Sequence, residues 1–182
     1  MGRSLPRRLG ARPGAHRPGG RPLTGTLATL ATDPVPVVLR RATEADLPDL
    51  VRLLTDDPLG RDREAADPAP YRRAFALIDA DPAHLLAVVV DGADVVATVQ
   101  LSFIPGLSRQ GALRAQVEAV RVAAGYRSRG LGAAMLGWAI EEARRRGCAL
   151  VQLTTDKSRD DAHRFYEQLG FVASHEGMKL LL

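Results

Sequence analysis

The clearest chemical pattern in the chain is Arg-x-x-Gly-x-Gly over Arg127–Gly132, which follows an apolar stretch and precedes an amphipathic one. This pattern predicts a turn that leads from a strand into the first residues of a helix. The N-terminus of a helix presents unpaired backbone N–H groups and the positive end of the helix dipole, which together bind phosphate. Gly130 and Gly132 remove side chains that would keep a diphosphate away from those N–H groups, and Arg127 and Arg129 add positive charge.

Two other interpretations of these glycines remain open. Gly130 and Gly132 could serve only to let the turn pack tightly. A dinucleotide-binding Gly-x-Gly-x-x-Gly motif is the nearest competing pattern, but Met135 stands at its third glycine position. The pattern also comes after strands that are expected to be antiparallel, where a dinucleotide-binding unit would not begin.

A second pattern, Ala-x-x-x-Tyr-x-x-x-Gly-Phe, runs from Ala162 through Tyr166 to Phe171. Together the two patterns resemble the GNAT acyltransferases, which use acetyl-CoA and carry the signature Gln/Arg-x-x-Gly-x-Gly/Ala. The motifs stand in the family's order, with an expected helix and strand between them, and the resemblance covers about residues 37–180. It implies an acetyl-CoA-dependent N-acetyltransferase.

The resemblance also implies which residues hold acetyl-CoA. Backbone amides of the signature loop bind the diphosphate, and the preceding strand pairs with the pantetheine arm through main-chain hydrogen bonds. The amide of Val122 stabilises the negative charge that develops on the acetyl carbonyl. The residues assigned to the cofactor are Val120, Val122, Arg127, Ser128, Arg129, Gly130, Leu131, Gly132 and Ala133. Many family members have Asn where this chain has Arg159, so the contact of that asparagine cannot be carried over.

Two side chains are candidates for proton transfer. Glu118 shares a strand face with Val120 and Val122 by the two-residue period, so we expect a partly buried carboxylate that accepts a proton from the amine. The alternative for Glu118 is a salt bridge to Arg114 or to another arginine at the edge of the core. Tyr166 matches the family tyrosine that protonates the departing thiolate, and its alternative is a packed aromatic side chain with a hydrogen-bonded hydroxyl.

The elements that must position these residues are expected to form one α/β domain over residues 37–182. Strands are predicted at Val37–Arg40, Leu85–Val90, Asp94–Phe103, Arg114–Val122, Ala149–Thr155 and Phe171–Leu181. Helices are predicted at Glu44–Leu54, Tyr71–Asp79, Leu131–Arg146 and Asp160–Gln168. This order predicts a mixed, mostly antiparallel central sheet flanked by helices. The resemblance adds a parallel strand pair that is splayed at the acetyl-CoA site.

Charge separates the beginning of the chain from the rest. The 182 residues carry a net charge of +4, but the first 21 residues contain six Arg and no acidic residue, which leaves 19 basic and 21 acidic residues after them. Residues 1–36, rich in Arg, Pro and Gly, are expected to be a disordered extension. The expected fold is close to neutral, so a nucleic-acid partner is not indicated.

Composition narrows the remaining classes. A single Cys excludes a disulfide framework and a cysteine-based zinc site, and no metal is expected. No apolar stretch approaches the ~20 residues that span a membrane, so we expect a cytoplasmic protein without a membrane partner. The expected partners are acetyl-CoA and an amine substrate, and a homodimer is left open.

Acetyl transfer to a primary amine of a small molecule, by direct attack in a ternary complex, is the leading interpretation. The alternatives are another acyl group, a protein amine, a non-catalytic acyl-CoA sensor, and nucleic-acid binding through the Arg-rich extension. Glu118 and Tyr166 favour catalysis, because a binding module needs neither. Acidic residues between the first two expected helices weakly favour a cationic amine; they are Asp56, Asp57, Asp62, Glu64 and Asp67.

Overall fold

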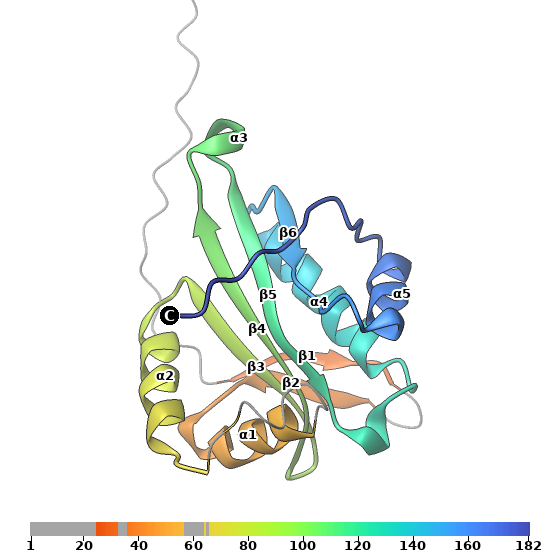
Figure 1. The fold of residues 1–182 in the computed structure, drawn as a ribbon. Coiled ribbons are helices and arrows are strands. Elements are labelled where there is room, and N and C mark those ends of the chain that lie inside the picture. Colours follow the sequence, from red (N-terminus) through yellow and green to blue (C-terminus); the bar gives the residue numbers. More distant parts are fainter. Residues whose placement is uncertain (1–24, 33–35, 57–63, 65) are drawn as a thin grey trace, which may run out of the picture.

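Six strands form one sheet in the computed structural model of the chain, which describes residues 25–32, 36–56, 64 and 66–182. Neighbouring strands are antiparallel from β1 to β5, whereas β5 and β6 are parallel (Figure 1). The predicted α/β fold, with a mixed and mostly antiparallel sheet flanked by helices, is confirmed. In the order in which they lie across the sheet, the strands are β1 Thr26–Leu30, β2 Val37–Arg41, β3 His84–Asp91, β4 Asp94–Pro105, β5 Leu113–Val122 and β6 Leu150–Leu153.

Helices cover both faces of this sheet. α1 and α2 pack against one face through Leu53 and Phe75, and α4 packs against the other through Met135 and Leu136. α5 adds the partly buried Phe165 to the α4 side. The helical segments are η1 Glu44–Asp46, α1 Leu47–Thr55, α2 Ala69–Ala80, α3 Ser108–Gly111, η2 Ala124–Tyr126, α4 Leu131–Arg145 and α5 Asp160–Gln168. Within the described residues, no helix is both long enough and apolar enough to cross a membrane.

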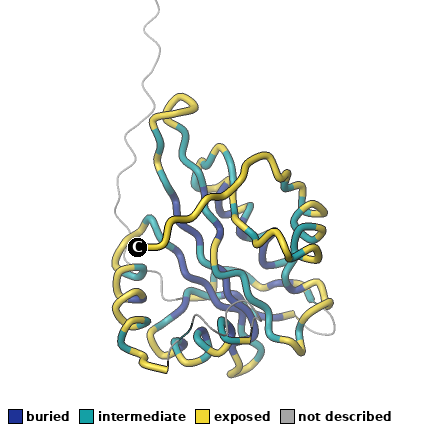
Figure 2. The backbone as a smooth tube through the Cα atoms, viewed as in Figure 1, coloured by how far each residue is buried: buried dark blue, intermediate teal, exposed yellow. Residues whose placement is uncertain are grey.

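β3 shows how the sequence encodes a sheet that is covered on both faces. Leu86 and Val88 face α1 and α2, Ala87 and Val89 face α4, and all four are buried. A strand in this position is a continuous apolar run rather than an alternating one. Figure 2 shows the buried part of the chain concentrated in these central strands.

The predicted turn and helix start are both present. Gly92, with a φ of 60°, lies in the turn that joins β3 to β4, where Asp91 pairs with Asp94. The helix expected from Glu44 begins as the 3-10 turn η1 and continues as α1. The Thr43 N–H donates to Asp46 Oδ2 at 2.7 Å, so the aspartate satisfies a backbone donor at the helix start.

The end of α4 is fixed by a buried carboxylate. Glu142 accepts hydrogen bonds from Arg145 and Arg146 at 2.7 Å each. Burial alone would raise the pKa of Glu142, but these two hydrogen bonds outweigh it and lower the pKa below its ordinary value. The Arg146 guanidinium also lies 4.0 Å from the centre of the Phe103 ring on β4. These contacts hold the C-terminal end of α4 against the sheet.

The expectation of disorder is wrong for Thr26–Leu30, which form β1. This strand pairs antiparallel with β2, and Leu30 is buried in the core on the α4 side. The short apolar pattern of β1 lies among Pro and Gly residues, which obscured it, and pairing with β2 supplies the backbone partners that a five-residue strand needs. Residues 1–24 and 33–35 of the expected extension lie outside the described residues.

The strand predicted at Phe171–Leu181 is also wrong. The chain after α5 has no regular secondary structure, and Figure 1 shows it crossing the view of the sheet without joining it as a strand. Lys157 Nζ and Glu176 Oε1 lie 2.8 Å apart and hold it at one point. Apart from Phe171 and Val172, the segment is mostly Leu, Met, Lys, Glu and His, which have modest strand preference without a partner edge.

Candidate active site

A β-bulge interrupts β5 between Glu118 and Arg121. Gln100 of β4 lies opposite Glu118, and Thr98 lies opposite Arg121, so β5 has one residue more than β4 between these pairs. Ala119 has a φ of 51°, in the left-handed region that non-glycine residues rarely adopt. An extra residue of this kind bends the strand and increases its twist. Glu118 and Arg121 therefore lie on the same face of the sheet.

The bulge overturns the expected position of Glu118. Val122 lies opposite Ala97, and both Val120 and Val122 pack against the core on the α4 side, whereas Glu118 lies on the other face. The two-residue period fails here because the extra residue shifts the alternation by one. Glu118 is also exposed rather than partly buried. Its carboxylate is therefore accessible to water.

The main-chain groups of Val122 point away from β4. The Ala123 N–H donates to the Val96 carbonyl at 2.8 Å. In an antiparallel ladder a bond at this position lies next to a non-hydrogen-bonded pair, which here is Val122 and Ala97. The N–H and C=O of Val122 therefore do not bond to β4. In agreement with this direction, Arg127 Nε donates to the Val122 carbonyl at 2.9 Å. The Val122 N–H points to the same side.

This side of β5 opens into a gap. β6 pairs with β5 only over Arg114–Val117 and ends at Leu153, whereas β5 continues to Val122. By alternation the main chain of Val120 also points into the gap, and Arg121 Nη1 donates to its carbonyl at 2.8 Å. The parallel pair is therefore splayed beyond Val117, and the freed edge of β5 presents main-chain groups there.

The loop after β5 is held in an uncommon backbone shape. Ser128 and Gly130 have φ angles of 61° and 76°, so two of three consecutive residues are left-handed. Arg127 Nη2 lies 3.2 Å from Asp56 Oδ2 at the end of α1. The Arg127 side chain therefore anchors the loop to β5 and α1, whereas the sequence predicted only that it adds positive charge for the diphosphate.

A second anchor comes from the hairpin between β3 and β4. The Tyr126 hydroxyl donates to Asp91 Oδ2 at 2.7 Å, and this hydrogen bond raises the pKa of Tyr126. The Arg129 guanidinium lies 5.6 Å from the centre of the Tyr126 ring. The loop is thus fixed to three separate elements before α4 begins.

The N-terminus of α4 fits a diphosphate. Gly130 is the residue before the helix, and no side chain caps the first-turn N–H groups. A Cβ on Gly130 would meet nothing within 4 Å, so no protein atom crowds the backbone at the helix start. A Cβ on Gly132 would lie 3.4 Å from Phe165 Cζ, an ordinary contact that agrees with the Gly/Ala choice at this signature position. The residues from Arg127 to Ala133, which the sequence assigns to the cofactor, thus lie together at the N-terminus of α4.

Tyr166 lies on α5, half-buried between two aromatic rings. Its ring centre lies 5.3 Å from that of Phe165 and 5.9 Å from that of Phe171. Burial raises the pKa of Tyr166, and the positive charges of Arg159 and Arg121 oppose that rise. The phenol therefore stays protonated at neutral pH, as a proton donor must.

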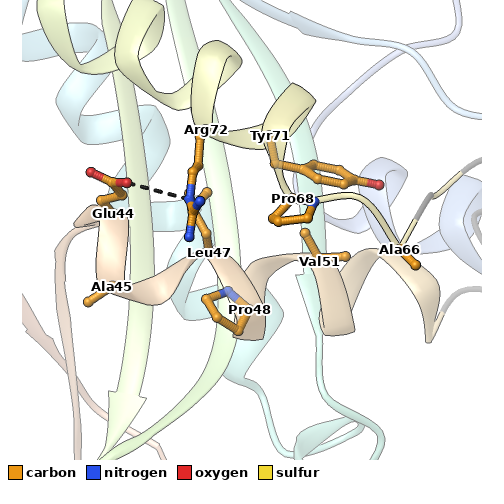
Figure 3. A pocket seen from close by; sticks show the side chains of 9 residues that line it. All are labelled: Glu44, Ala45, Leu47, Pro48, Val51, Ala66, Pro68, Tyr71 and Arg72. Atoms are coloured by element: carbon orange, nitrogen blue, oxygen red, sulfur yellow. Dashed lines mark ion pairs between the residues drawn. The ribbon is translucent and has the colours of Figure 1, made fainter.

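A separate cavity of about 530 Å³ lies between α1 and α2. Figure 3 shows its side chains converging from η1, α1 and the start of α2, with Glu44 and Arg72 paired at 3.7 Å. Neither Glu118 nor Tyr166 lines it. The lining residues are Glu44, Ala45, Leu47, Pro48, Val51, Ala66, Pro68, Tyr71 and Arg72.

Sequence reasoning missed three residues of this region. Tyr126 and Asp91 are 35 positions apart, and no local pattern indicates their contact. Arg121 could have been found, because a charged residue between Val120 and Val122 is unusual in a strand that borders the core. Asp57 and Asp62 of the expected acidic loop lie outside the described residues, while Asp56 is paired with Arg127.

A splayed parallel pair beside an uncapped helix N-terminus defines an acyl-CoA-dependent transferase architecture. The model of the acetyltransferase (GNAT) family matches residues 47–171, so the chain belongs to this family. It is an acetyl-CoA-dependent N-acetyltransferase, and acetyl-CoA is the family's co-substrate.

Relatives of known activity support this assignment. The chain is 32% identical to the aminoalkylphosphonate N-acetyltransferase of Salmonella typhimurium, over 79% of this chain and 90% of the relative. It is also 32% identical to the glucosamine 6-phosphate N-acetyltransferase of Trypanosoma brucei brucei, over 82% of this chain and 98% of the relative. A solved structure named a transcriptional regulator from Bacillus halodurans C-125 is 49% identical, with a TM-score of 0.78 over 80% of this chain and 99% of that chain.

Proposed function

We propose that the chain transfers the acetyl group of acetyl-CoA directly to the primary amine of a small molecule, with both substrates bound together. One observation carries this proposal. The main chain of Val120 and Val122 faces the gap between β5 and β6 in the same region where the N-terminus of α4 is open. Main-chain pairing for an extended arm and an anion site for a diphosphate thus occur side by side.

The cofactor role follows from these groups. Backbone N–H groups from Arg127 to Ala133 bind the diphosphate, and the freed edge at Val120 and Val122 pairs with the pantetheine arm. Acetyl-CoA supplies the thioester that is attacked. The Val122 N–H donates to the thioester carbonyl oxygen and stabilises the negative charge that develops there.

Two side chains move protons in this proposal. Glu118 is exposed, so it accepts the proton of the amine through a water molecule rather than by direct contact. Tyr166 has a raised pKa and donates its proton to the departing thiolate. A protein that only binds acyl-CoA would need neither a base at Glu118 nor an acid at Tyr166.

The names of the two relatives support a small-molecule acceptor. Aminoalkylphosphonates and glucosamine 6-phosphate are both small amines that carry a phosphorus oxyanion. We therefore favour a small amine over a protein amine, and acetyl over larger acyl groups.

The direct test measures thiol release from acetyl-CoA with a panel of small primary amines. We expect turnover with at least one amine, and Tyr166→Phe should lower kcat by roughly 10²–10⁴ with little change in acetyl-CoA affinity. The phenylalanine retains the ring that packs between Phe165 and Phe171. Acetyl-CoA binding without turnover of any amine would support a sensor instead, and full activity of Tyr166→Phe would exclude the acid role.

The role of Glu118 has its own test. Glu118→Gln should remove or shift the acidic limb of the pH–rate profile, and its loss of activity should shrink at high pH, where the free amine dominates. A pH profile identical to that of the wild type would contradict the base role.

A further inference from the structure

One face of the sheet changes from apolar to polar along the strands. Under α1 and α2 this face carries Leu86, Val88 and Val95, all of them buried. Beyond that cover, alternation with residues that pack on the α4 side, such as Leu101 and Val117, places polar side chains on it. We call these residues the polar platform; they are His84, Gln100, Ser102, Gln116 and Gln152.

The strand register joins four members of the platform into one row across the sheet. His84 of β3 lies opposite Ser102 of β4, which lies opposite Gln116 of β5 on its other side. Gln116 in turn lies beside Gln152 of the parallel strand β6. His84 Nδ1 and Ser102 Oγ are 2.9 Å apart, and Gln152 Nε2 donates to Gln116 Oε1 at 2.7 Å. Hydrogen bonds thus order neighbouring side chains of the row.

The composition of the platform differs from that of an ordinary solvated surface. The chain has no Asn and five Gln, and three of the five Gln lie on the platform. None of its members carries a carboxylate, ammonium or guanidinium group, although such residues make up 25% of the chain and are the usual choice for a surface that meets only water. Amides and hydroxyls both donate and accept hydrogen bonds, so they suit uncharged hydroxyl groups.

The platform adjoins the side chain that is proposed to accept the proton of the amine. Gln100 lies opposite Glu118 on the neighbouring strand. Gln116 precedes Glu118 by two residues on the same face, a step of about 7 Å along a strand. Gln116 and Gln152 also form the last pair on this face before β5 and β6 part. A small molecule whose amine lies near Glu118 therefore has its remaining atoms over the platform.

The platform is accessible from solvent. Gln152 and Glu118 are exposed, and Gln100 and Gln116 are half-buried. The segment after α5 borders the platform at the end of β6, because a Cβ on Gly177 would lie 3.7 Å from Thr154 Cγ2. The platform thus lies between the apolar cover of α1 and α2 and this segment.

We propose that the polar platform binds hydroxyl groups of the acceptor, which is a primary amine on a polyhydroxylated carbon skeleton, such as an amino sugar. This inference rests on the proposed function, and it adds the class of acceptor and the residues that recognise it. An amine without hydroxyl groups would displace water from these side chains without replacing its hydrogen bonds. Sites of this kind discriminate strongly against analogues that lack the hydroxyl.

The test compares glucosamine with its 4-deoxy and 6-deoxy derivatives at saturating acetyl-CoA. The amine has the same immediate neighbours in all three probes, so a difference reports the missing hydroxyl. We expect the wild type to prefer glucosamine over at least one derivative by roughly tenfold in kcat/KM, chiefly through KM. In Gln116→Leu and Gln152→Leu this preference should fall to about threefold or less, because the partner of the hydroxyl is lost.

Gln168→Leu is the matched control. Gln168 is an exposed glutamine on α5, outside the platform, and its substitution should leave the preference unchanged. Gln152 is exposed as well, so Gln152→Leu should melt close to the wild type. A wild-type preference in both platform variants, or an equal loss of preference in Gln168→Leu, would overturn the proposal. Turnover of 2-aminoethylphosphonate without turnover of glucosamine would overturn it too, while leaving the proposed function intact.

A binding measurement separates this inference from the proposed function. If no amine releases thiol, the proposed function fails, and calorimetric titration of the CoA-saturated protein with glucosamine still tests the platform. Binding that weakens in Gln152→Leu but not in Gln168→Leu would support the platform. Absence of binding to the wild type, or equal binding to all three proteins, would overturn it.

Discussion

The loop between β5 and α4 and the chain after α5 differ in how firmly other parts of the molecule hold them. The loop between β5 and α4 is fixed by Arg127 to the Val122 carbonyl and by Tyr126 to Asp91. The segment after α5 has no regular secondary structure, and an ion pair between the exposed side chains of Lys157 and Glu176 ties it to the loop before α5. Five of its apolar side chains are exposed: Val172, Met178, Leu180, Leu181 and Leu182. The loop keeps its shape because its own backbone geometry and its anchoring side chains hold it. The segment after α5 does not form a strand, because a strand also needs the edge of a sheet to pair with.

The largest effect is expected from a substitution in the loop between β5 and α4. Gly130→Val should weaken acetyl-CoA binding roughly a hundredfold, because it puts a branched side chain into open space at the residue before α4, where the proposal places the diphosphate. Gly147→Val is the matched control, since Gly147 also has a positive φ, of 77°, and open space around it, but lies at the other end of α4. Both variants carry similar backbone strain, so both should melt earlier. Equal acetyl-CoA affinities in calorimetry would contradict this position of the diphosphate.

A smaller effect is expected when one anchor of the loop is removed. Tyr126→Phe loses the hydrogen bond to Asp91 and should weaken acetyl-CoA binding by about threefold to tenfold, because the loop then samples other shapes. Tyr71→Phe is the control, since its hydroxyl also donates to a carboxylate, that of Glu64, at 2.7 Å. Equal calorimetric affinities of the two variants would show that the Tyr126 anchor does not shape the cofactor site.

The smallest effect concerns the exposed segment. Leu181 is 92% exposed, so Leu181→Ala should change the free energy of unfolding by less than about 0.5 kcal/mol in urea denaturation. Leu136 on α4 is fully buried, and Leu136→Ala should cost about 2–5 kcal/mol. A cost above about 1 kcal/mol for Leu181→Ala would show that the end of the chain packs against the domain.

The sequence predicted most of the helices and strands that build the site. The β3–β4 hairpin, α4 and α5 follow from glycine positions and apolar periodicity, which are local signals. The family motifs placed the residues from Arg127 to Ala133 at a helix start, as the structure has them. β1 escaped because its five residues depend on pairing with β2 rather than on a strong pattern of their own.

The features that were not predictable depend on pairing and on contacts between distant residues. The face of Glu118 follows from a bulge, and no residue type near Ala119 signals a left-handed backbone. The contact of Tyr126 with Asp91 and that of Arg127 with Asp56 join elements that only the folded sheet brings together. Periodicity describes one element at a time, so such contacts lie beyond it.

β4 and β5 pair regularly on both sides of Ala119. Ala119 is therefore an extra residue that changes the course of β5, while β5 stays paired with β4 before and after it. Deleting Ala119 would leave Glu118 opposite Gln100 and Val122 opposite Ala97, and every side chain would keep its face. The deletion would, however, remove the bend and the added twist that a bulge gives to its strand. One deletion would thus change the course of β5 along the gap without replacing any residue that faces it.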